Sequence, residues 1–156
     1  MNGCGGAKWW KGVVLAIVAQ GWAGCSTPSW LCVAPSGPHT ITLIADPSAN
    51  GDAAVTVDLV FISDQLVAEQ VAALPAHEYF SRRDQLQRDF PGGMQVRSWE
   101  LAPGQIARDL PLDATCNRVR TLLFARYATP GDHRQTLGSA KNIIVWLNQE
   151  DFAVSP

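Results

Sequence analysis

Charged side chains are scarce in this sequence of 156 residues, at 17% of the total, whereas hydrophobic residues make up 47%. A composition so poor in charge excludes an intrinsically disordered chain. The formal net charge of -2 gives no electrostatic reason to expect nucleic acid as a partner. The length is enough for one domain with a hydrophobic core and hardly enough for two.

The first part of the chain lacks acidic residues before Asp46, and its only lysines are Lys8 and Lys11. It also lacks a long hydrophobic run. The apolar segment 12–24 would extend about 20 Å as a helix, whereas the hydrocarbon core of a bilayer is roughly 30 Å thick. A positive start followed by a short apolar segment predicts an export signal peptide over residues 1–24 rather than a stable transmembrane helix.

The predicted signal peptide ends in Trp22-Ala23-Gly24 and Cys25 follows it; these four residues resemble the bacterial lipobox, usually Leu-Ala/Ser-Gly/Ala-Cys. The resemblance implies that the Cys25 thiol carries a diacylglyceryl group and that the chain is cut before it. The new amine would then receive a third acyl chain such as palmitate, and three chains anchor a protein without measurable dissociation. Ser26 after the cysteine implies export to the outer membrane. The alternative is an ordinary secreted protein in which Cys25 pairs with another cysteine.

Cysteine is also sparse, with four in the chain. Cys4 would leave with the signal peptide and Cys25 would carry lipid, so Cys32 and Cys116 remain as one possible disulfide in the oxidising periplasm. Two free thiols are the alternative. Residues 25–38, rich in proline and without sustained periodicity, predict a lipidated tether to a domain over residues 39–156.

Hydrophobic periodicity in that domain alternates between the period of a strand and the period of a helix. A period of two predicts strands over residues 38–45, 55–62, 95–101, 106–112, 118–129 and 141–148. Helical spacing predicts two helices, one capped by Ser63 and ended by Pro75, the other over residues 76–90. We expect the first two strands to form an antiparallel hairpin and segment 118–129, apolar on both faces, to be a central strand. About six or seven strands with a helical insertion at 63–90 predict a mainly β fold, a β-sandwich.

No segment carries a recognisable catalytic motif: no serine lies in a GxSxG sequence, and Glu150-Asp151 is interpreted as solvated charge. The three histidines, His39, His77 and His133, lie in separate segments without ligand spacing and are interpreted as surface residues. We therefore predict no catalytic residue, cofactor or metal, and a protein that is not an enzyme.

The loop 46–54 copies half of a calcium-binding EF-hand loop with the residues Asp46, Ser48, Asn50, Gly51 and Asp52. A calcium loop of this kind needs a glutamate at its twelfth position, where this chain has Val57. The sequence therefore favours a tight turn at Asn50-Gly51 over a metal site.

The order of segments resembles the outer-membrane lipoproteins of type VI secretion systems, the TssJ (VasD) family. After the lipobox, the resemblance rests on AVTVDLVFISD, EYFSRRDQL, RSWELAPGQIARDLPLD, VRTLLFARYA and NIIVWLN, within residues 38–148. It implies a transthyretin-like sandwich anchored to the periplasmic face of the outer membrane as part of the type VI membrane complex.

The family resemblance also implies a partner, the periplasmic domain of the inner-membrane component TssM. The loop between the first two strands contributes to that contact in the family, and it corresponds here to Asp46, Ser48, Asn50, Gly51 and Asp52. Other hypotheses are a pilotin-like or other binding lipoprotein of another envelope machine, and a periplasmic hydrolase or inhibitor. A loop with no partner at all is the alternative for the site.

Overall fold

The computed structural model describes residues 37–112 and 117–156. The predicted signal peptide, the lipidation of Cys25 and the predicted Cys32–Cys116 disulfide lie outside the described residues. Among the residues described, no helix is both long enough and apolar enough to span a bilayer.

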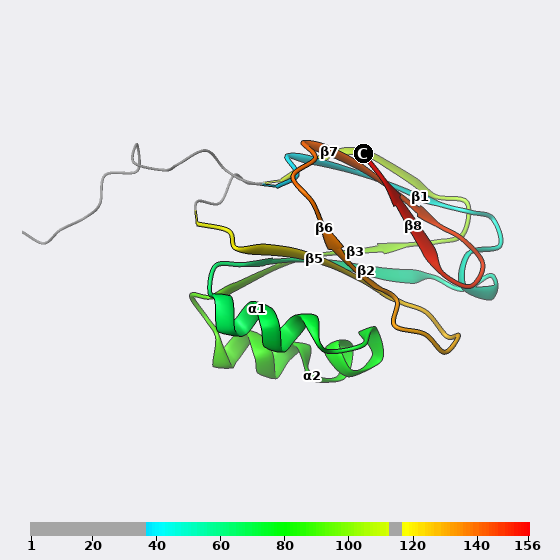
Figure 1. The fold of residues 1–156 in the computed structure, drawn as a ribbon. Coiled ribbons are helices and arrows are strands. Elements are labelled where there is room, and N and C mark those ends of the chain that lie inside the picture. Colours follow the sequence, from blue (N-terminus) through cyan, green and yellow to red (C-terminus); the bar gives the residue numbers. More distant parts are fainter. Residues whose placement is uncertain (1–36, 113–116) are drawn as a thin grey trace, which may run out of the picture. The chain divides into compact units, whose positions relative to one another are not determined.

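Two four-stranded β-sheets pack face to face, and two helices cover the outer face of one of them (Figure 1). The first sheet has the order β4-β1-β7-β8 and the second has the order β3-β2-β5-β6. Every neighbouring pair is antiparallel except β1 and β7, which run parallel. The strands are β1 (Thr40–Ala45), β2 (Val55–Ile62), β3 (Met94–Leu101), β4 (Ile106–Pro111), β5 (Arg120–Arg126), β6 (Arg134–Leu137), β7 (Asn142–Leu147) and β8 (Phe152–Ser155). The mainly β sandwich predicted from sequence is confirmed.

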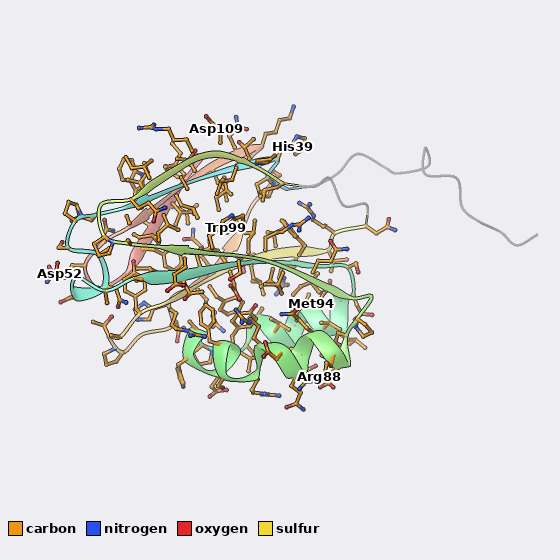
Figure 2. All side chains as sticks on the ribbon, turned by 180° about the vertical axis from the view of Figure 1, so that it is seen from behind. His39, Asp52, Arg88, Met94, Trp99 and Asp109 are labelled. Atoms are coloured by element: carbon orange, nitrogen blue, oxygen red, sulfur yellow. The ribbon has the colours of Figure 1, made fainter. Side chains whose placement is uncertain are left out.

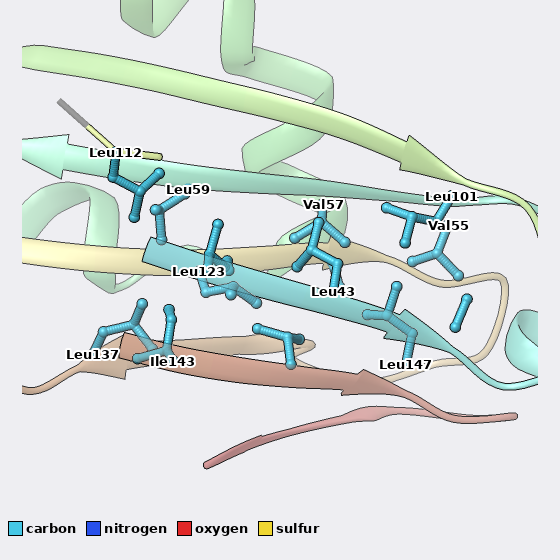
Figure 3. Close-up of a cluster of buried hydrophobic side chains, with 14 of the residues drawn as sticks. Leu43, Val55, Val57, Leu59, Leu101, Leu112, Leu123, Leu137, Ile143 and Leu147 are labelled. Atoms are coloured by element: carbon cyan, nitrogen blue, oxygen red, sulfur yellow. The ribbon is translucent and has the colours of Figure 1, made fainter. Parts of the chain in front are cut away.

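The main hydrophobic core fills the space between the two sheets (Figure 3). Alternate residues of β2 point into it, because successive side chains of a strand face opposite sides of the sheet. Val55, Val57 and Leu59 from β2 meet Leu43 from β1 and Leu123 from β5, all completely buried. Each such side chain stabilises the fold by about 1.5–3 kcal/mol through removal of apolar surface from water.

A second core lies between the β3-β2-β5-β6 sheet and the helices α1 (Gln65–Ala72) and α2 (Ala76–Asp89). It takes the residues of β2 and β5 that point away from the first core, such as Val60 and Phe124. This is why both strands are apolar on both faces, and the prediction that segment 118–129 is a central strand is confirmed: β5 lies between β2 and β6.

A completely buried carboxylate, Asp58 on β2, joins the helical layer to the sheet. It accepts hydrogen bonds from the Tyr79 hydroxyl of α2 at 3.0 Å and from the Ser98 hydroxyl of β3 at 2.5 Å. The Arg83 guanidinium lies 3.4 Å from the same carboxylate. Burial, followed by the negative charge of Asp58, raises the pKa of Tyr79. The phenol therefore remains a hydrogen-bond donor to Asp58 at any physiological pH.

The predicted hairpin between the first two strands is wrong, because β1 and β2 belong to different sheets. β1 pairs with β4 and β7, and β2 pairs with β3 and β5. The loop 46–54 crosses from one sheet to the other instead of returning along the same sheet. Its tight turn is nevertheless present, since Asn50 and Gly51 both have positive φ angles, 49° and 61°.

The remaining boundaries differ from the predictions by small amounts. Asp64 rather than Ser63 caps α1, by accepting a 3.0 Å hydrogen bond from the backbone N–H of Val67. Pro75 separates the two helices as predicted, and its fixed φ suits the position before the first turn of α2. The short edge strands β6 and β8 were not predicted.

Candidate functional site

Four loops form one end of the sandwich, which we call the four-loop end (Figure 1). They are the β1–β2 loop (46–54), the β3–β4 loop (102–105), the β5–β6 loop (127–133) and the β7–β8 loop (148–151). The described chain begins at the opposite end, and His39 and Asp52 mark the two ends in Figure 2. The five residues predicted from sequence all lie in the first of these loops.

Asn50 holds the β1–β2 loop against its neighbours. Its side-chain oxygen accepts a 2.7 Å hydrogen bond from the backbone N–H of Ala128, and its amide nitrogen donates to the carbonyl of Ala54 at 3.0 Å. Its backbone N–H donates to the carbonyl of Asn148 at 3.2 Å. Asn50 thus connects three of the four loops, so its role is to position the loop rather than to present a free contact.

Asp46 and Ser48 form a local turn at the start of the same loop. The Asp46 carboxylate accepts hydrogen bonds from the backbone N–H and from the hydroxyl of Ser48, both at 2.9 Å. These two bonds, the backbone one foremost, lower the pKa of Asp46 below its ordinary value. Asp46 therefore presents a negative charge to solvent. Its backbone N–H donates to the carbonyl of Leu147 at the end of β7, and its carbonyl accepts from the N–H of Gly104 in the β3–β4 loop.

The tip of the loop consists of the exposed residues Gly51 and Asp52. Asp52 has a φ of 65°, a left-handed conformation that aspartate and asparagine tolerate better than most residues. The tip is therefore a fixed backbone turn with a solvent-exposed carboxylate beside it.

The four loops contain five carboxylate side chains and neither a lysine nor an arginine: Asp46, Asp52, Asp132, Glu150 and Asp151. Two of them have partners, because Asp132 lies 3.5 Å from the Arg134 guanidinium of β6 and Asp151 contacts His133. Asp46 and Asp52 in the β1–β2 loop are both exposed to solvent.

His133 and Asp151 lie together within this end, a contact that sequence analysis missed. The interpretation of His133 as a surface residue is wrong, since it is 8% exposed and stacks on Tyr127 with ring centroids 4.9 Å apart. Its Nδ1 donates to the Asp151 carboxylate at 2.9 Å, and its Nε2 lies 2.9 Å from the carbonyl of Thr129. The His133 ring thus links its own loop, through Thr129, to the β7–β8 loop, through Asp151.

A histidine–aspartate pair of this kind resembles the general base and the orienting acid of a hydrolase. Here the two residues connect the β5–β6 loop to the β7–β8 loop. The Nε2 atom that would take a proton from a nucleophile is already directed at the Thr129 carbonyl. A surface groove of about 490 Å³ beside it is lined by His77, Phe80 and Arg126, and the Arg126 guanidinium lies over the Phe80 ring at 4.5 Å. Over residues 37–112 and 117–156, no cluster of three or more histidine, cysteine or acidic side chains could hold a metal ion.

Three solved structures share this fold. The type VI secretion lipoprotein TssJ1 from Pseudomonas aeruginosa is 18% identical with a TM-score of 0.54, and the match covers 78% of this chain and 96% of that one. Lip from Serratia marcescens, a membrane-bound component of the type VI secretion system, is 12% identical with a TM-score of 0.59, over 78% and 99% of the two chains. A chain described as a type VI membrane complex is 16% identical with a TM-score of 0.59, over the same shares.

No family model matches the sequence, and no curated protein does. The described residues form a β-sandwich with one helix-covered sheet. Its architecture is that of the type VI secretion lipoproteins, so the resemblance to the TssJ family is confirmed at the level of the fold.

Proposed function

We propose that this protein is a structural lipoprotein of a type VI secretion membrane complex. Cys25 anchors it to the outer membrane, and the domain binds the periplasmic domain of the inner-membrane component TssM. The shared fold supports the class of protein, and the lipobox-like sequence before Cys25 supports the anchor.

The observation that carries the binding role is the construction of the β1–β2 loop. Its hydrogen bonds to the neighbouring loops hold the exposed tip in one conformation before a partner arrives. A loop that is already ordered loses little conformational entropy on binding, and this favours affinity. Its end of the sandwich lies opposite the start of the described chain at Gly37 (Figure 2), and the exposed tip of the loop is accessible to a partner there.

Co-purification with the TssM periplasmic domain tests the binding role. The double variant Asp46→Asn/Asp52→Asn removes two negative charges and keeps side chains that tolerate the local turn conformations. We expect it to weaken TssM binding at least about tenfold, because each charged contact at an interface contributes on the order of 1 kcal/mol or more. Titration calorimetry or pull-down at matched concentrations would measure the loss.

Asp109→Asn is the matched control, since Asp109 on β4 is also exposed and also has a positive φ, 48°. It should bind TssM like the original chain. Asn50→Ala tests the positioning role and should weaken binding without removing a charge from the loop. Undiminished binding by the double variant would exclude the β1–β2 loop as the contact.

The anchor has an independent test in Cys25→Ser. This variant should no longer incorporate labelled palmitate and should not fractionate with the outer membrane. Continued palmitate incorporation would exclude Cys25 as the lipidated residue.

A further inference from the structure

The outer face of the β4-β1-β7-β8 sheet carries a line of apolar side chains, which we call the apolar row. The strand registers pair Ile44 of β1 with Ile106 of β4 and with Trp146 of β7. Trp146 is paired in turn with Ala153 of β8. The apolar row therefore crosses all four strands, a width of about 14 Å at the usual strand spacing. Ile106 is 46% exposed and Trp146 is 45% exposed.

The apolar row faces outward because the alternate residues of the same strands fill the main core. On β7, Val145 and Leu147 are completely buried there, so Trp146 between them points to the other side of the sheet. The second sheet also has apolar side chains on its outer face, such as Val60 and Phe124, but α1 and α2 cover them. In the described part of the chain, both helices lie on that second sheet and the apolar row is left open (Figure 1). Single exposed apolar side chains are common, whereas contiguous ones are typical of interaction surfaces.

The apolar row lies directly beside the four-loop end. Ile44 is two positions before Asp46, the first residue of the β1–β2 loop. Trp146 is likewise two positions before Asn148, the first residue of the β7–β8 loop, and Ile106 is the first residue after the β3–β4 loop. The apolar row and the loops thus form one continuous surface.

Further from the loops, the same face of the sheet becomes mostly polar. Ile144 extends the apolar surface by one position, but its partners in the register are Thr42 and Ser155. At the far end of β1, the Thr40 hydroxyl donates to the side-chain oxygen of Asn142 at 2.9 Å. The apolar surface is therefore concentrated next to the loop that we propose as the TssM contact.

That proposed contact needs more surface than the β1–β2 loop supplies. A stable interface takes roughly 20–30 residues from each partner, whereas the loop 46–54 has nine. Charged residues such as aspartate are depleted at the centre of interfaces, where tryptophan often contributes much of the binding energy. Asp46 and Asp52, both exposed, therefore suit the polar rim of an interface, and the adjacent apolar row suits its centre.

We propose that the apolar row is the centre of the partner interface and the β1–β2 loop its rim, with Trp146 as the main energetic contact. The inference rests on the proposed function, binding to the periplasmic domain of TssM. The partner surface that fits has apolar side chains opposite the apolar row and lysine or arginine opposite Asp46 and Asp52. The helix-covered sheet, on the other side of the sandwich, takes no part in this interface.

Hydroxyl-radical oxidation of Trp146 tests the proposal directly. The full lipidated chain is held on neutral phosphatidylcholine liposomes and is oxidised with and without the TssM periplasmic domain. Trypsin cleaves after Lys141 and leaves residues 142–156 as a peptide in which Trp146 is the only tryptophan. Mass spectrometry of this peptide reads the oxidation of Trp146. We expect ready oxidation in the free chain and loss of most of it with saturating TssM, because the centre of an interface excludes water.

Two variants measure the energetic contribution. Trp146→Thr removes the ring, keeps a β-branched residue that strands favour, and should weaken TssM binding at least about tenfold. Ile106→Thr on the edge strand β4 should weaken it about threefold or more, since fewer apolar groups are buried. Leu66→Gln is the matched control and should bind like the original chain, because Leu66 is 77% exposed on α1, which covers the other sheet. Circular dichroism checks that each variant is folded.

Unchanged oxidation of Trp146 in a chain that binds TssM would overturn the proposal and leave the proposed function intact. Shielding of Trp146 without TssM would overturn it too. Shielding that grows with protein density on the liposomes would assign the apolar row to a second copy, and shielding at every density would assign it to the bilayer or to the chain's own tether. Failure of the original chain to bind TssM would overturn the proposed function as well, and it is distinguishable because that binding is measured first.

Discussion

The buried carboxylate of Asp58 gives the sharpest test of how the helical layer is held on the sheet. Asp58→Ala leaves the buried Tyr79 hydroxyl and the Ser98 hydroxyl without their acceptor and removes the partner of Arg83. A hydrogen bond to a charged group contributes about 1.5–3 kcal/mol, and removing one member of a buried ion pair costs about 3–5 kcal/mol. Since Arg83 keeps 29% of its side chain exposed, we expect the total loss to be about 3–5 kcal/mol.

This loss is a large part of the 5–15 kcal/mol that stabilises a typical domain, so the unfolding temperature should fall by roughly 10–20 °C. Urea unfolding followed by circular dichroism at 25 °C measures the free energy of unfolding directly, and an unchanged slope with urea would show that the native fold is retained.

Tyr79→Phe is the matched control. It removes one hydrogen bond to Asp58 and keeps the ring stacked on Phe124, with centroids 4.0 Å apart. We expect it to cost about 1.5–3 kcal/mol, and the double variant Asp58→Ala/Tyr79→Phe to cost at least about 1 kcal/mol less than the sum of the single variants. A loss below about 1 kcal/mol for Asp58→Ala, or strict additivity in the double variant, would refute the role of this carboxylate.

Two further predictions concern the four-loop end. Gly131→Ala should destabilise the domain by about 1–3 kcal/mol, because overpacking is costly and the new Cβ would lie 2.7 Å from ring atoms of His133. Thermal unfolding measures the loss, and Gly138→Ala is the control because no atom lies within 4 Å of its Cβ. Equal effects of the two variants would contradict the predicted clash with His133. The lowered pKa of Asp46 means that its contribution to stability is present above the ordinary aspartate pKa and is lost as the pH falls through the lowered value. Ser48→Ala should raise the pKa of Asp46 only part of the way to its ordinary value, because the backbone N–H still donates; an unchanged titration in carboxyl ¹³C NMR would argue against the Ser48 hydroxyl.

Local patterns were enough to predict most of the elements. The alternation of Val55, Val57 and Leu59 predicted β2 with its observed bounds, Val55–Ile62. Pro75 marked the boundary between the two helices, since proline lacks the N–H that a helix interior needs. The short edge strands β6 and β8 gave no comparable signal, because they have four residues each and few buried side chains.

The candidate site was predictable only in part. The polar loop 46–54 was recognisable by its composition, and Asn50-Gly51 indicated its turn. The role of Asn50 was not, because its hydrogen bond to Ala128 joins residues 78 positions apart. The pairing of His133 with Asp151 likewise depends on two different loops meeting at one end of the sandwich.

The sequence by itself determined six of the eight described strands, the two helices and the apolar faces of β2 and β5, since these follow from side-chain periodicity and from the backbone limits of proline and glycine. Only the tertiary structure decided that β1 and β2 lie in different sheets, that Asp58 is buried, and that His133 meets Asp151. The physical reason is the distance along the chain over which the residues interact. Periodicity involves residues close in sequence and shows which face of an element avoids water. The choice of neighbouring strand and the contacts between residues far apart in sequence depend on how the elements pack together.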